Sequence, residues 1–297
     1  MNWLVYFFGS GLAFFAGTCL LVSGLSLGWI GKRSIVRGLR RVTVFIGLIF
    51  VVLSAAPLPI WYYVLLGVAC LSWPVIEGKH SEKLQRIRTF LRLAVLLITL
   101  AGVAVEIPWH FMPRIPPADG KRLYIIGDSV AAGTGENSIK TWPALLAKEE
   151  SIEVVDLSEM GAMVRNAIRK AESVEIGTGL ILIEIGGNDL LGTSTAQDFE
   201  NDLSRLLELL RGKGRALVMF ELPLPPFANE FGRVQRRLAA KHQVTLIPKR
   251  VFINILTTNG ATGDSVHLTQ FGHELMSQVV WKLIRPAFRD FSPAGTI

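Results

Sequence analysis

The sequence predicts an all-α membrane region followed by an α/β domain with a parallel sheet, and three observations carry this prediction. The 297 residues have a mean hydropathy of +0.41, which is high for a soluble enzyme, and the long apolar runs all lie before Pro113. From Lys121 onward, short apolar runs alternate with segments of helical spacing. Between the two parts stands MPRIPPADGKR, whose prolines and glycine predict a short extended linker at residues 113–120.

The net charge of +7 belongs to the first part of the chain. Residues 1–112 hold ten of the 31 Lys and Arg and three of the 24 Asp and Glu, so the remaining 21 of each sign balance in residues 113–297. A neutral domain has no general electrostatic attraction for a polyanion, so we exclude nucleic acid as a partner. The two cysteines, Cys19 and Cys70, lie in apolar runs and form no disulfide framework.

Four apolar stretches predict four membrane spans, at about residues 3–30, 42–57, 59–76 and 91–112. The first stretch has no basic leader, which predicts a retained anchor and not a cleaved signal peptide. The two middle stretches are short, and the prolines between them predict a tight turn.

Two basic loops, GKRSIVRGLRR and EGKHSEKLQRIRTFLR, predict the orientation of these spans. Short loops rich in Lys and Arg stay on the cytoplasmic side of a membrane. Both loops are cytoplasmic only if residues 42–76 cross the bilayer twice. We therefore expect an integral protein of a bacterial inner (cytoplasmic) membrane, with residues 121–297 outside the cytoplasm, on the periplasmic or cell-surface side.

Small residues follow one stripe of the first span: Gly9, Ala13, Gly17, Gly24 and Gly28. Small side chains let helices approach closely in lipid. The stripe predicts packing within the protein's own helices, and self-association through the first span is the alternative. Glu106, at the end of the fourth span, is expected to be solvated.

Five strands and four helices are expected from residue 121 onward. The strand candidates are RLYIIG, IEVVDLS, LILIEIGG, RALVMFELP and QVTLIP, and the helix candidates are TWPALLAKEE, VRNAIRKAE, DFENDLSRLLELLRGKG and EFGRVQRRLAAKHQ. Apolar strands separated by helices indicate a parallel sheet with helices on both faces. Ligands of such sheets bind beyond the carboxyl ends of the strands.

The candidate nucleophile and base stand in two loops. Ser129 lies in YIIGDSVAAGTG, where an apolar strand gives way to a glycine-rich turn, and a serine becomes a nucleophile when a neighbouring base takes its proton. The alternative is that Asp128 or Ser129 only caps a helix. His267 in GDSVHLTQFGHELM is the candidate base, and Asp264 is close enough to orient its imidazole. A surface histidine beside a turn residue is the alternative, and His273 is expected to be a solvated helix residue.

An acyl-transfer site also needs N–H donors where the tetrahedral oxyanion forms. Asn188 in IEIGGNDL follows two glycines at a strand end and offers a side-chain amide. The backbone N–H groups of Ser129 and Gly161 are the other candidates, and an ordinary Gly-Gly-Asn-Asp turn is the alternative. Glu184, within the same strand, is expected to be a buried acid with a structural partner.

Four blocks, GDS, the glycine of LSEMGAM, GGND and DSVH, have the order and spacing of the SGNH (GDSL-type) serine hydrolases, which the chain resembles over about residues 121–285. Within the family it is most similar to small bacterial lysophospholipase-, thioesterase- and arylesterase-like members, through TWPALLA, ELPLPP and HLTQFGHELM. The resemblance implies a three-layer α/β/α fold like that of flavodoxin, with a five-stranded parallel sheet, for residues 121–297. It also implies that no metal or organic cofactor is needed.

The same resemblance assigns roles to the candidate residues. It implies that Ser129 is the nucleophile, His267 the base and Asp264 its orienting carboxylate, with Ser129, Gly161 and Asn188 as oxyanion donors. The chain departs from the family pattern at Asp156, Met163 and Leu268, none of which is a catalytic position. The departures leave the substrate preference open.

Together these features predict a membrane-anchored serine esterase whose substrate lies in or near the membrane. The ester would belong to a lipid, or to an acyl or acetyl group on an envelope glycan. One alternative is an O-acyltransferase that uses the same residues to move an acyl group to a sugar hydroxyl. Another is a catalytically idle domain beside a functional membrane bundle, against which the intact Ser129, Asp264 and His267 argue.

Overall fold

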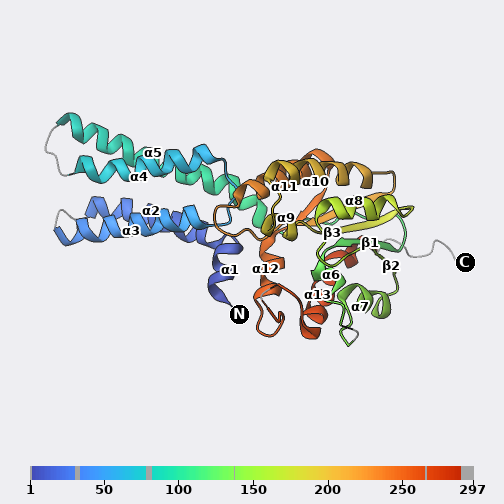
Figure 1. Cartoon of the computed structure of the whole chain (residues 1–297). Coiled ribbons are helices and arrows are strands. Elements are labelled where there is room, and N and C mark those ends of the chain that lie inside the picture. Colours follow the sequence, from blue (N-terminus) through green and yellow to red (C-terminus); the bar gives the residue numbers. More distant parts are fainter. Residues whose placement is uncertain (1, 31–33, 78–81, 137, 265, 289–297) are drawn as a thin grey trace, which may run out of the picture. The chain divides into compact units, whose positions relative to one another are not determined.

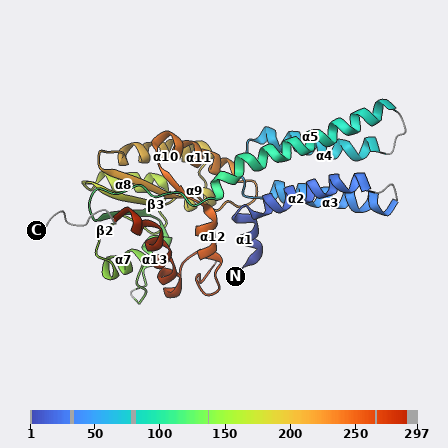
Figure 2. The ribbon, with the colours of Figure 1, turned by 180° about the vertical axis from the view of Figure 1, so that it is seen from behind.

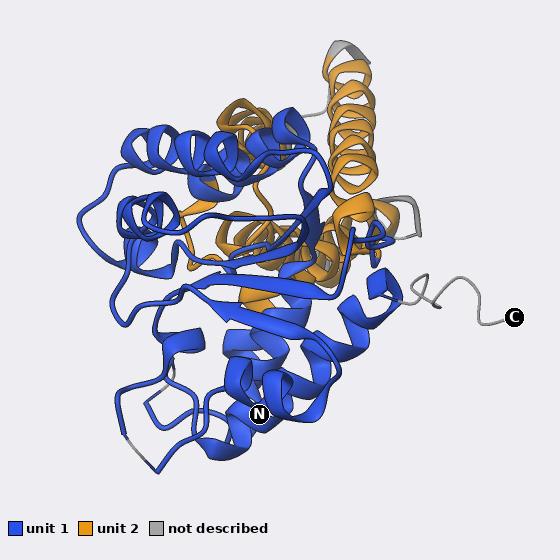
Figure 3. Ribbon diagram, turned by 90° about the vertical axis from the view of Figure 1, so that its right-hand side faces the viewer, with its two compact units in different colours: residues 1–6, 112–223, 230–297 blue, residues 7–111, 224–229 orange. Residues whose placement is uncertain are grey.

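The computed structural model describes residues 2–30, 34–77, 82–136, 138–264 and 266–288. The chain divides into two units, coloured separately in Figure 3. The α/β unit holds residues 1–6, 112–223 and 230–297, and the helical unit holds residues 7–111 and 224–229. The division near residue 112 follows the change in composition. Two short segments are exceptions: residues 1–6 belong to the α/β unit, and residues 224–229 belong to the helical unit.

The α/β unit is built on a five-stranded parallel sheet, as expected. Its strands are β1 (Arg122–Gly127), β2 (Glu153–Asp156), β3 (Gly179–Glu184), β4 (Arg215–Phe220) and β5 (Thr245–Ile247). Their order is β2-β1-β3-β4-β5, and every neighbouring pair is parallel. Because β1 and β3 are adjacent and pair as far as Gly127 and Glu184, the turns that follow them leave the sheet side by side.

Helices cover both faces of this sheet, which makes three layers (Figure 1). The long helices are α7 (Trp142–Glu149), α8 (Val164–Glu172), α10 (Ala196–Leu210), α11 (Asn229–His242), α12 (Lys249–Thr257) and α13 (Gln270–Ile284). The short ones are α6 (Ser129–Ala132), α9 (Gly187–Leu191) and the 3-10 turn η2 (Arg285–Phe288). Helices α8, α10 and α11 lie on one face, and α7, α12 and α13 lie on the other. Among the long helices, α12 and α13 are additions to the four candidate segments, although His273 of α13 was expected to lie on a helix.

The main core lies under α7, α12 and α13. Alternate strand residues such as Leu123, Leu182 and Val218 are fully buried there against Trp142 and Met276, as the period-two geometry of a strand requires. The expected linker is extended, but it packs on this core. Its buried Ala118 donates a backbone hydrogen bond to the carbonyl of Ala287 at 3.1 Å.

The helical unit contains two antiparallel helix pairs, α2 with α3 and α4 with α5, visible in Figure 2. The helices are α1 (Trp3–Gly9), α2 (Leu12–Ile30), α3 (Ser34–Leu53), α4 (Ile60–Glu77) and α5 (Glu82–Glu106), followed by the 3-10 turn η1 (Ile107–His110). The single helix expected at residues 3–30 is wrong. It breaks at Gly11, whose φ of +88° is open to glycine, and the two parts are bent by 77°.

Only part of this unit meets the length and hydropathy of a membrane span. Among the described residues, Leu84–His110 qualifies alone, with a hydropathy of 2.2, and the bent pair Trp3–Gly9 and Leu12–Ser26 qualifies if it acts as one span. The apolar part of α4, Ile60–Ser72, is shorter. Helices α3 and α5 begin earlier than the apolar stretches because they continue into the basic segments. The four-span topology therefore stays a proposal, and the loop residues 31–33 and 78–81 lie outside the described part of the chain.

Glycines bring α2 and α3 into backbone contact. A Cβ atom placed on Gly17 would lie 2.6 Å from the carbonyl oxygen of Gly47, and one placed on Gly24 would lie 2.7 Å from a methyl group of Val44. The expected packing within the protein's own helices is confirmed at Gly17 and Gly24. Self-association through the first span stays a prediction.

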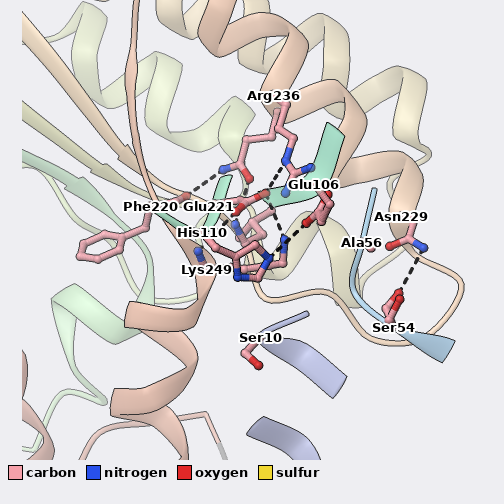
Figure 4. A network of polar contacts seen from close by, with 12 residues as sticks. Ser10, Ser54, Ala56, Glu106, His110, Phe220, Glu221, Asn229, Arg236 and Lys249 are labelled. Carbon is pink, nitrogen blue, oxygen red and sulfur yellow. Dashed lines mark hydrogen bonds and ion pairs between the residues drawn. The ribbon is translucent and has the colours of Figure 1, made fainter. Parts of the chain in front are cut away.

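Each unit holds buried polar contacts, drawn in Figure 4. In the α/β unit, Glu221 follows β4 and its Oε1 accepts from Arg236 Nε at 2.7 Å, with Lys249 Nζ at 3.4 Å. In the helical unit, Asn229 Nδ2 donates to the Ser54 carbonyl at 3.3 Å. Such groups are tolerated inside a protein because each charge or dipole meets an opposite one.

Glu106 is fully buried, so the expectation that it is solvated is wrong. Its Oε1 lies 3.4 Å from His110 Nε2, one helical turn further on. The turn η1 continues α5 and places His110 one turn after Glu106, a contact that the residue pattern alone did not reveal.

Candidate active site

The turn after β1 presents Ser129 at the carboxyl edge of the sheet. Asp128 is the N-cap of α6, and its Oδ1 accepts from Val130 N at 3.0 Å. Asp128 is therefore the capping residue, and Ser129 Oγ donates to no protein group among the described residues. Gly127 is required here because a Cβ atom at this position would lie 2.6 Å from the Ala131 side chain. The local fold thus leaves the hydroxyl of Ser129 available for chemistry.

The loop before α13 places Asp264 directly against His267. Asp264 Oδ2 lies 2.6 Å from His267 Nδ1, while its Oδ1 accepts from His267 N at 2.9 Å and from Val266 N at 3.2 Å. These hydrogen bonds hold the pKa of the Asp264 carboxyl well below its usual range. An ionised carboxylate on Nδ1 leaves Nε2 of the ring as the proton acceptor. The expected carboxylate–imidazole contact is therefore present.

His267 also lies within electrostatic reach of the turn that carries Ser129. Its charge lowers the pKa of Asp128, the residue next to Ser129, against the larger effect of burial, which raises that pKa to about 6. Ser129 and His267 are not hydrogen-bonded in the structure. Catalytic contacts of this kind are often long in an enzyme without substrate and tighten when substrate binds.

Gly161 and Asn188 meet beside this turn. Glu159, in the loop after β2, donates its N–H to the Gly127 carbonyl at 3.2 Å, which ties the loop to the end of β1. Gly161 follows with a φ of +72°, a conformation suited to glycine. Asn188 Nδ2 donates to the Ala162 carbonyl at 3.0 Å, so its amide is oriented with one N–H still open. The five residues expected at the site thus lie in loops and in the short helices α6 and α9, which follow the carboxyl ends of strands.

Two further acids support the site without being exposed to solvent. Asp189 is buried, and its Oδ2 accepts from Val164 N at 3.0 Å, which anchors the first turn of α8 to α9. Burial is also the main cause that raises the pKa of Asp189. The sequence reasoning assigned no role to Asp189, because its partner lies 25 residues away and leaves no local signal.

Glu184 is buried, as expected, and its carboxyl is hydrogen-bonded to the backbone of Asp128. It is buried at the end of β3, and its Oε2 has no hydrogen-bond partner among the described residues. Burial, and then the neighbouring Asp128, raise its pKa well above the usual value. Such an acid stays neutral, which removes the cost of burying a charge.

His273 is completely buried, so the expectation of a solvated residue is wrong. Its Nδ1 accepts from Trp142 N at 3.2 Å, which joins α13 to the start of α7. Burial lowers its pKa to about 4. The expectation failed because His273 lies on the inner face of α13, and the sequence does not show that α7 packs against this face.

A pH-dependent loss of stability is expected from His273. Its folded pKa lies below the unfolded value of about 6.5, so its contribution is fully present above pH 6.5 and is lost as pH falls toward 4. We expect the unfolding free energy to fall by on the order of 2 kcal/mol over this window, after allowance for solvent screening. Denaturant unfolding of the full chain and of His273→Asn, at matched pH values, measures this difference. Parallel pH curves for the two proteins would contradict it.

Replacing Asn188 by alanine is expected to lower kcat for ester hydrolysis by about 10² to 10³, with little change in KM, because one oxyanion donor is removed. The lost hydrogen bond to Ala162 should also reduce stability by about 1 kcal/mol. Steady-state kinetics with a p-nitrophenyl ester test this, with Asn201→Ala on the exposed face of α10 as control. A kcat close to that of the control would remove Asn188 from the oxyanion site.

No group of three or more His, Cys, Asp or Glu side chains in the described part of the chain is arranged to hold a metal ion.

Comparison with known proteins identifies the family of the segment that holds these residues. Residues 125–275 match the model of the GDSL-like Lipase/Acylhydrolase family. The esterase TesA of Pseudomonas aeruginosa is 25% identical over 185 residues, which cover 57% of this chain and 90% of the relative. An arylesterase of Vibrio mimicus is 28% identical over 140 residues, covering 43% and 70% of the two chains. Thioesterase 1/protease 1/lysophospholipase L1 of Escherichia coli (strain K12) is 23% identical over 173 residues, covering 55% and 83%.

A crystal structure of TesA shows the same fold, with a TM-score of 0.50 at 24% identity. The similarity covers 56% of this chain and 99% of that one, so TesA has almost nothing left to match the helical unit. The matched family segment contains every residue of the candidate site, from Ser129 to His267. The α/β unit has the five-stranded sheet and the loop arrangement described above. The chain therefore belongs to the GDSL-like lipase/acylhydrolase family.

Proposed function

We propose that this ester-hydrolysing enzyme is anchored in a membrane and cleaves its substrate through an acyl-enzyme on Ser129. The observation that supports it most is the Asp264–His267 contact of 2.6 Å, within electrostatic reach of a turn whose serine hydroxyl is not used by the fold. A bare serine is a weak nucleophile, and an oriented imidazole supplies the missing base.

In the first half-reaction, Ser129 Oγ attacks the ester carbonyl while His267 Nε2 takes the hydroxyl proton. Asp264 stabilises the imidazolium that forms and remains ionised itself. The negative charge on the carbonyl oxygen is met by the N–H groups of Ser129 and Gly161 and by Asn188 Nδ2. When the tetrahedral intermediate collapses, the proton on His267 passes to the alkoxide that leaves, and the acyl group stays on Ser129.

The second half-reaction repeats these steps with water. His267 removes a proton from a water molecule, which attacks the acyl carbonyl. The bond between the acyl carbon and Ser129 Oγ then breaks, and Oγ takes the proton back from His267. Transfer to a sugar hydroxyl would need only that an alcohol replace this water. The choice between hydrolysis and transfer thus depends on which acceptor reaches the acyl-enzyme.

The proposed substrate is a lipid ester, or an acyl or acetyl group on an envelope glycan, close to the membrane. The apolar segment Leu84–His110 supports membrane attachment, and the basic segments support an extracytoplasmic position for the α/β unit. The loop 224–229, which follows β4 at the carboxyl edge of the sheet, belongs to the helical unit.

The activity is tested with the full chain in detergent on p-nitrophenyl acetate, butyrate, octanoate and palmitate. A preference for octanoate or palmitate would indicate a lipid ester, and a preference for acetate would indicate a small acyl group. Release of p-nitrophenol that requires an added sugar, with the acyl group recovered on that sugar, would favour acyl transfer. Absence of all three results would overturn the proposed function.

Membrane placement needs a separate measurement. Single cysteines at exposed Ser151 and at Arg86, in a chain with Cys19 and Cys70 replaced, are labelled from outside spheroplasts by a membrane-impermeant maleimide. The proposed orientation predicts labelling at position 151 and protection at position 86. The reverse pattern, or recovery of the chain in the soluble fraction, contradicts it.

A further inference from the structure

An apolar groove lies between α3 and α4 in the helical unit. It has a volume of about 340 Å³ and is lined by Val42, Val44, Phe45, Leu48, Cys70 and Leu71, with Arg41 at one end. This volume is within the range of small-molecule sites, about 300–1,000 Å³. From Arg41 to Leu48 the helix rises about 10 Å, at 1.5 Å per residue. The groove is thus a narrow apolar channel with a cation at its end.

The groove exists because α3 packs on one side only. Gly17 and Gly47 let α2 and α3 touch through their backbones, whereas α3 and α4 share few contacts. The rim residues Val42, Phe45 and Leu71 are each more than half exposed. A groove of this kind is open along its length to whatever surrounds the helices.

Positive charge gathers at the same end of the groove. Arg40 is buried, and Arg92 of α5, Arg41 and Arg37 all act on it electrostatically, in that order of strength. All ten Lys and Arg of residues 1–112 lie in the segments 32–41 and 79–92, with only Glu77 and Glu82 beside them. This end is therefore strongly cationic whatever local ion pairs its side chains make. Holding several guanidinium groups together, one of them buried, favours a bound anion.

We propose that the α3–α4 groove is a binding site for one anionic phospholipid. An acyl chain lies along Val44, Phe45 and Leu48, and the phosphate is held by Arg41, the one basic residue among those that line the groove. The inference rests on the membrane placement proposed above, but not on catalysis. A free anion would match the net positive charge of this end but leave the apolar groove empty, whereas a neutral lipid would fill the groove without matching that net charge. An anionic lipid matches both features at once.

The test is native mass spectrometry of the full chain carrying Ser129→Ala, which prevents hydrolysis of the added lipid. The protein in detergent is titrated with phosphatidylglycerol or with phosphatidylcholine of the same acyl chains. We expect one phosphatidylglycerol to be retained in preference to phosphatidylcholine. Arg41→Gln should weaken phosphatidylglycerol binding about fivefold, from about 1 kcal/mol per basic residue. Cys70→Phe, which fills the groove, should reduce retention of both lipids.

Arg86→Gln is the matched control, because it removes the same charge from an exposed position of α5 that does not line the groove. We expect it to change phosphatidylglycerol retention less than twofold. Equal losses in Arg41→Gln and Arg86→Gln would overturn the site in favour of diffuse attraction to basic helix ends. Equal retention of the two lipids would also overturn it, as would a dimer whose mass excludes bound lipid.

These outcomes are separate from failure of the proposed function. An enzyme that hydrolyses no ester would still retain the lipid in this assay, since every protein in it carries Ser129→Ala. A chain that needs no detergent to remain in solution would contradict the membrane placement, whatever its esterase activity.

Discussion

Replacing Ser129 by alanine is expected to lower kcat/KM for ester hydrolysis by at least about 10⁴-fold. The change removes the atom that forms the acyl-enzyme, and removing the serine of a catalytic triad costs about as much as removing all three members. The residual rate would come from substrate binding and from the oxyanion donors. Steady-state hydrolysis of the best p-nitrophenyl ester by the full chain in detergent measures the loss.

The structure also predicts what this substitution leaves intact. Ser129 Oγ makes no hydrogen bond within the described residues, and Asp128 supplies the cap of α6, so the unfolding free energy should change by less than about 1 kcal/mol. Ser151→Ala, in the exposed turn before β2, is the control for a serine lost elsewhere. A serine-directed phosphonate should add its mass to the parent protein and not to Ser129→Ala. Activity retained in Ser129→Ala, or a phosphonate adduct on it, would exclude the serine mechanism.

The second large effect is expected from Asp264→Asn, which should lower kcat by about 10³ to 10⁴-fold. The amide cannot supply the negative charge that stabilises the imidazolium of His267, and it can present an N–H to Nδ1 that favours the wrong tautomer. KM should change little, because Asp264 touches the imidazole and not the substrate. Exposed Asp119→Asn, in the segment before β1, is the matched control.

The pH dependence adds a second test of the same residue. The pKa of Asp264 is held well below its usual range by His267 and by two backbone N–H groups. The carboxylate is therefore ionised at ordinary pH, and its contribution is lost only when pH falls through that lowered value. Any loss of kcat above about pH 4 must come from another group. Suppose that kcat of the parent protein falls with pH in the range of a normal carboxyl group and that this fall is absent in Asp264→Asn. Asp264 would then titrate in that range, and its lowered pKa would be wrong.

Local pattern was sufficient for the strands and for the candidate catalytic residues. Short apolar runs that are rich in β-branched residues and bounded by Gly, Asp or Pro are typical of strands in a covered sheet, and β1 to β4 form where these runs stand. The carboxylate at Asp264 lies three residues before His267, so one turn of chain brings them together. Ser129, Gly161 and Asn188 follow strand ends, and parallel strands carry their ends to one edge.

The sequence also showed that the net positive charge lies in residues 1–112, but it did not give the exact bounds of the helices there. Hydropathy averages over a window and does not register a single left-handed glycine, so the break at Gly11 was missed. Basic residues extend a helix as readily as apolar ones, which is why α3 begins at Ser34 and not at the edge of its apolar stretch.

The sequence by itself determined the family, the parallel sheet, and the serine, histidine and aspartate that are candidates for catalysis, because each depends on residues near one another in the chain or on strand ends. Only the tertiary structure decided that Asp128 is the cap beside Ser129, that His273 is buried against Trp142, and that Glu106 is buried with His110 beside it. It alone assigned residues 224–229 to the helical unit. The physical reason is that burial depends on which surfaces meet, and those surfaces come from segments far apart in sequence.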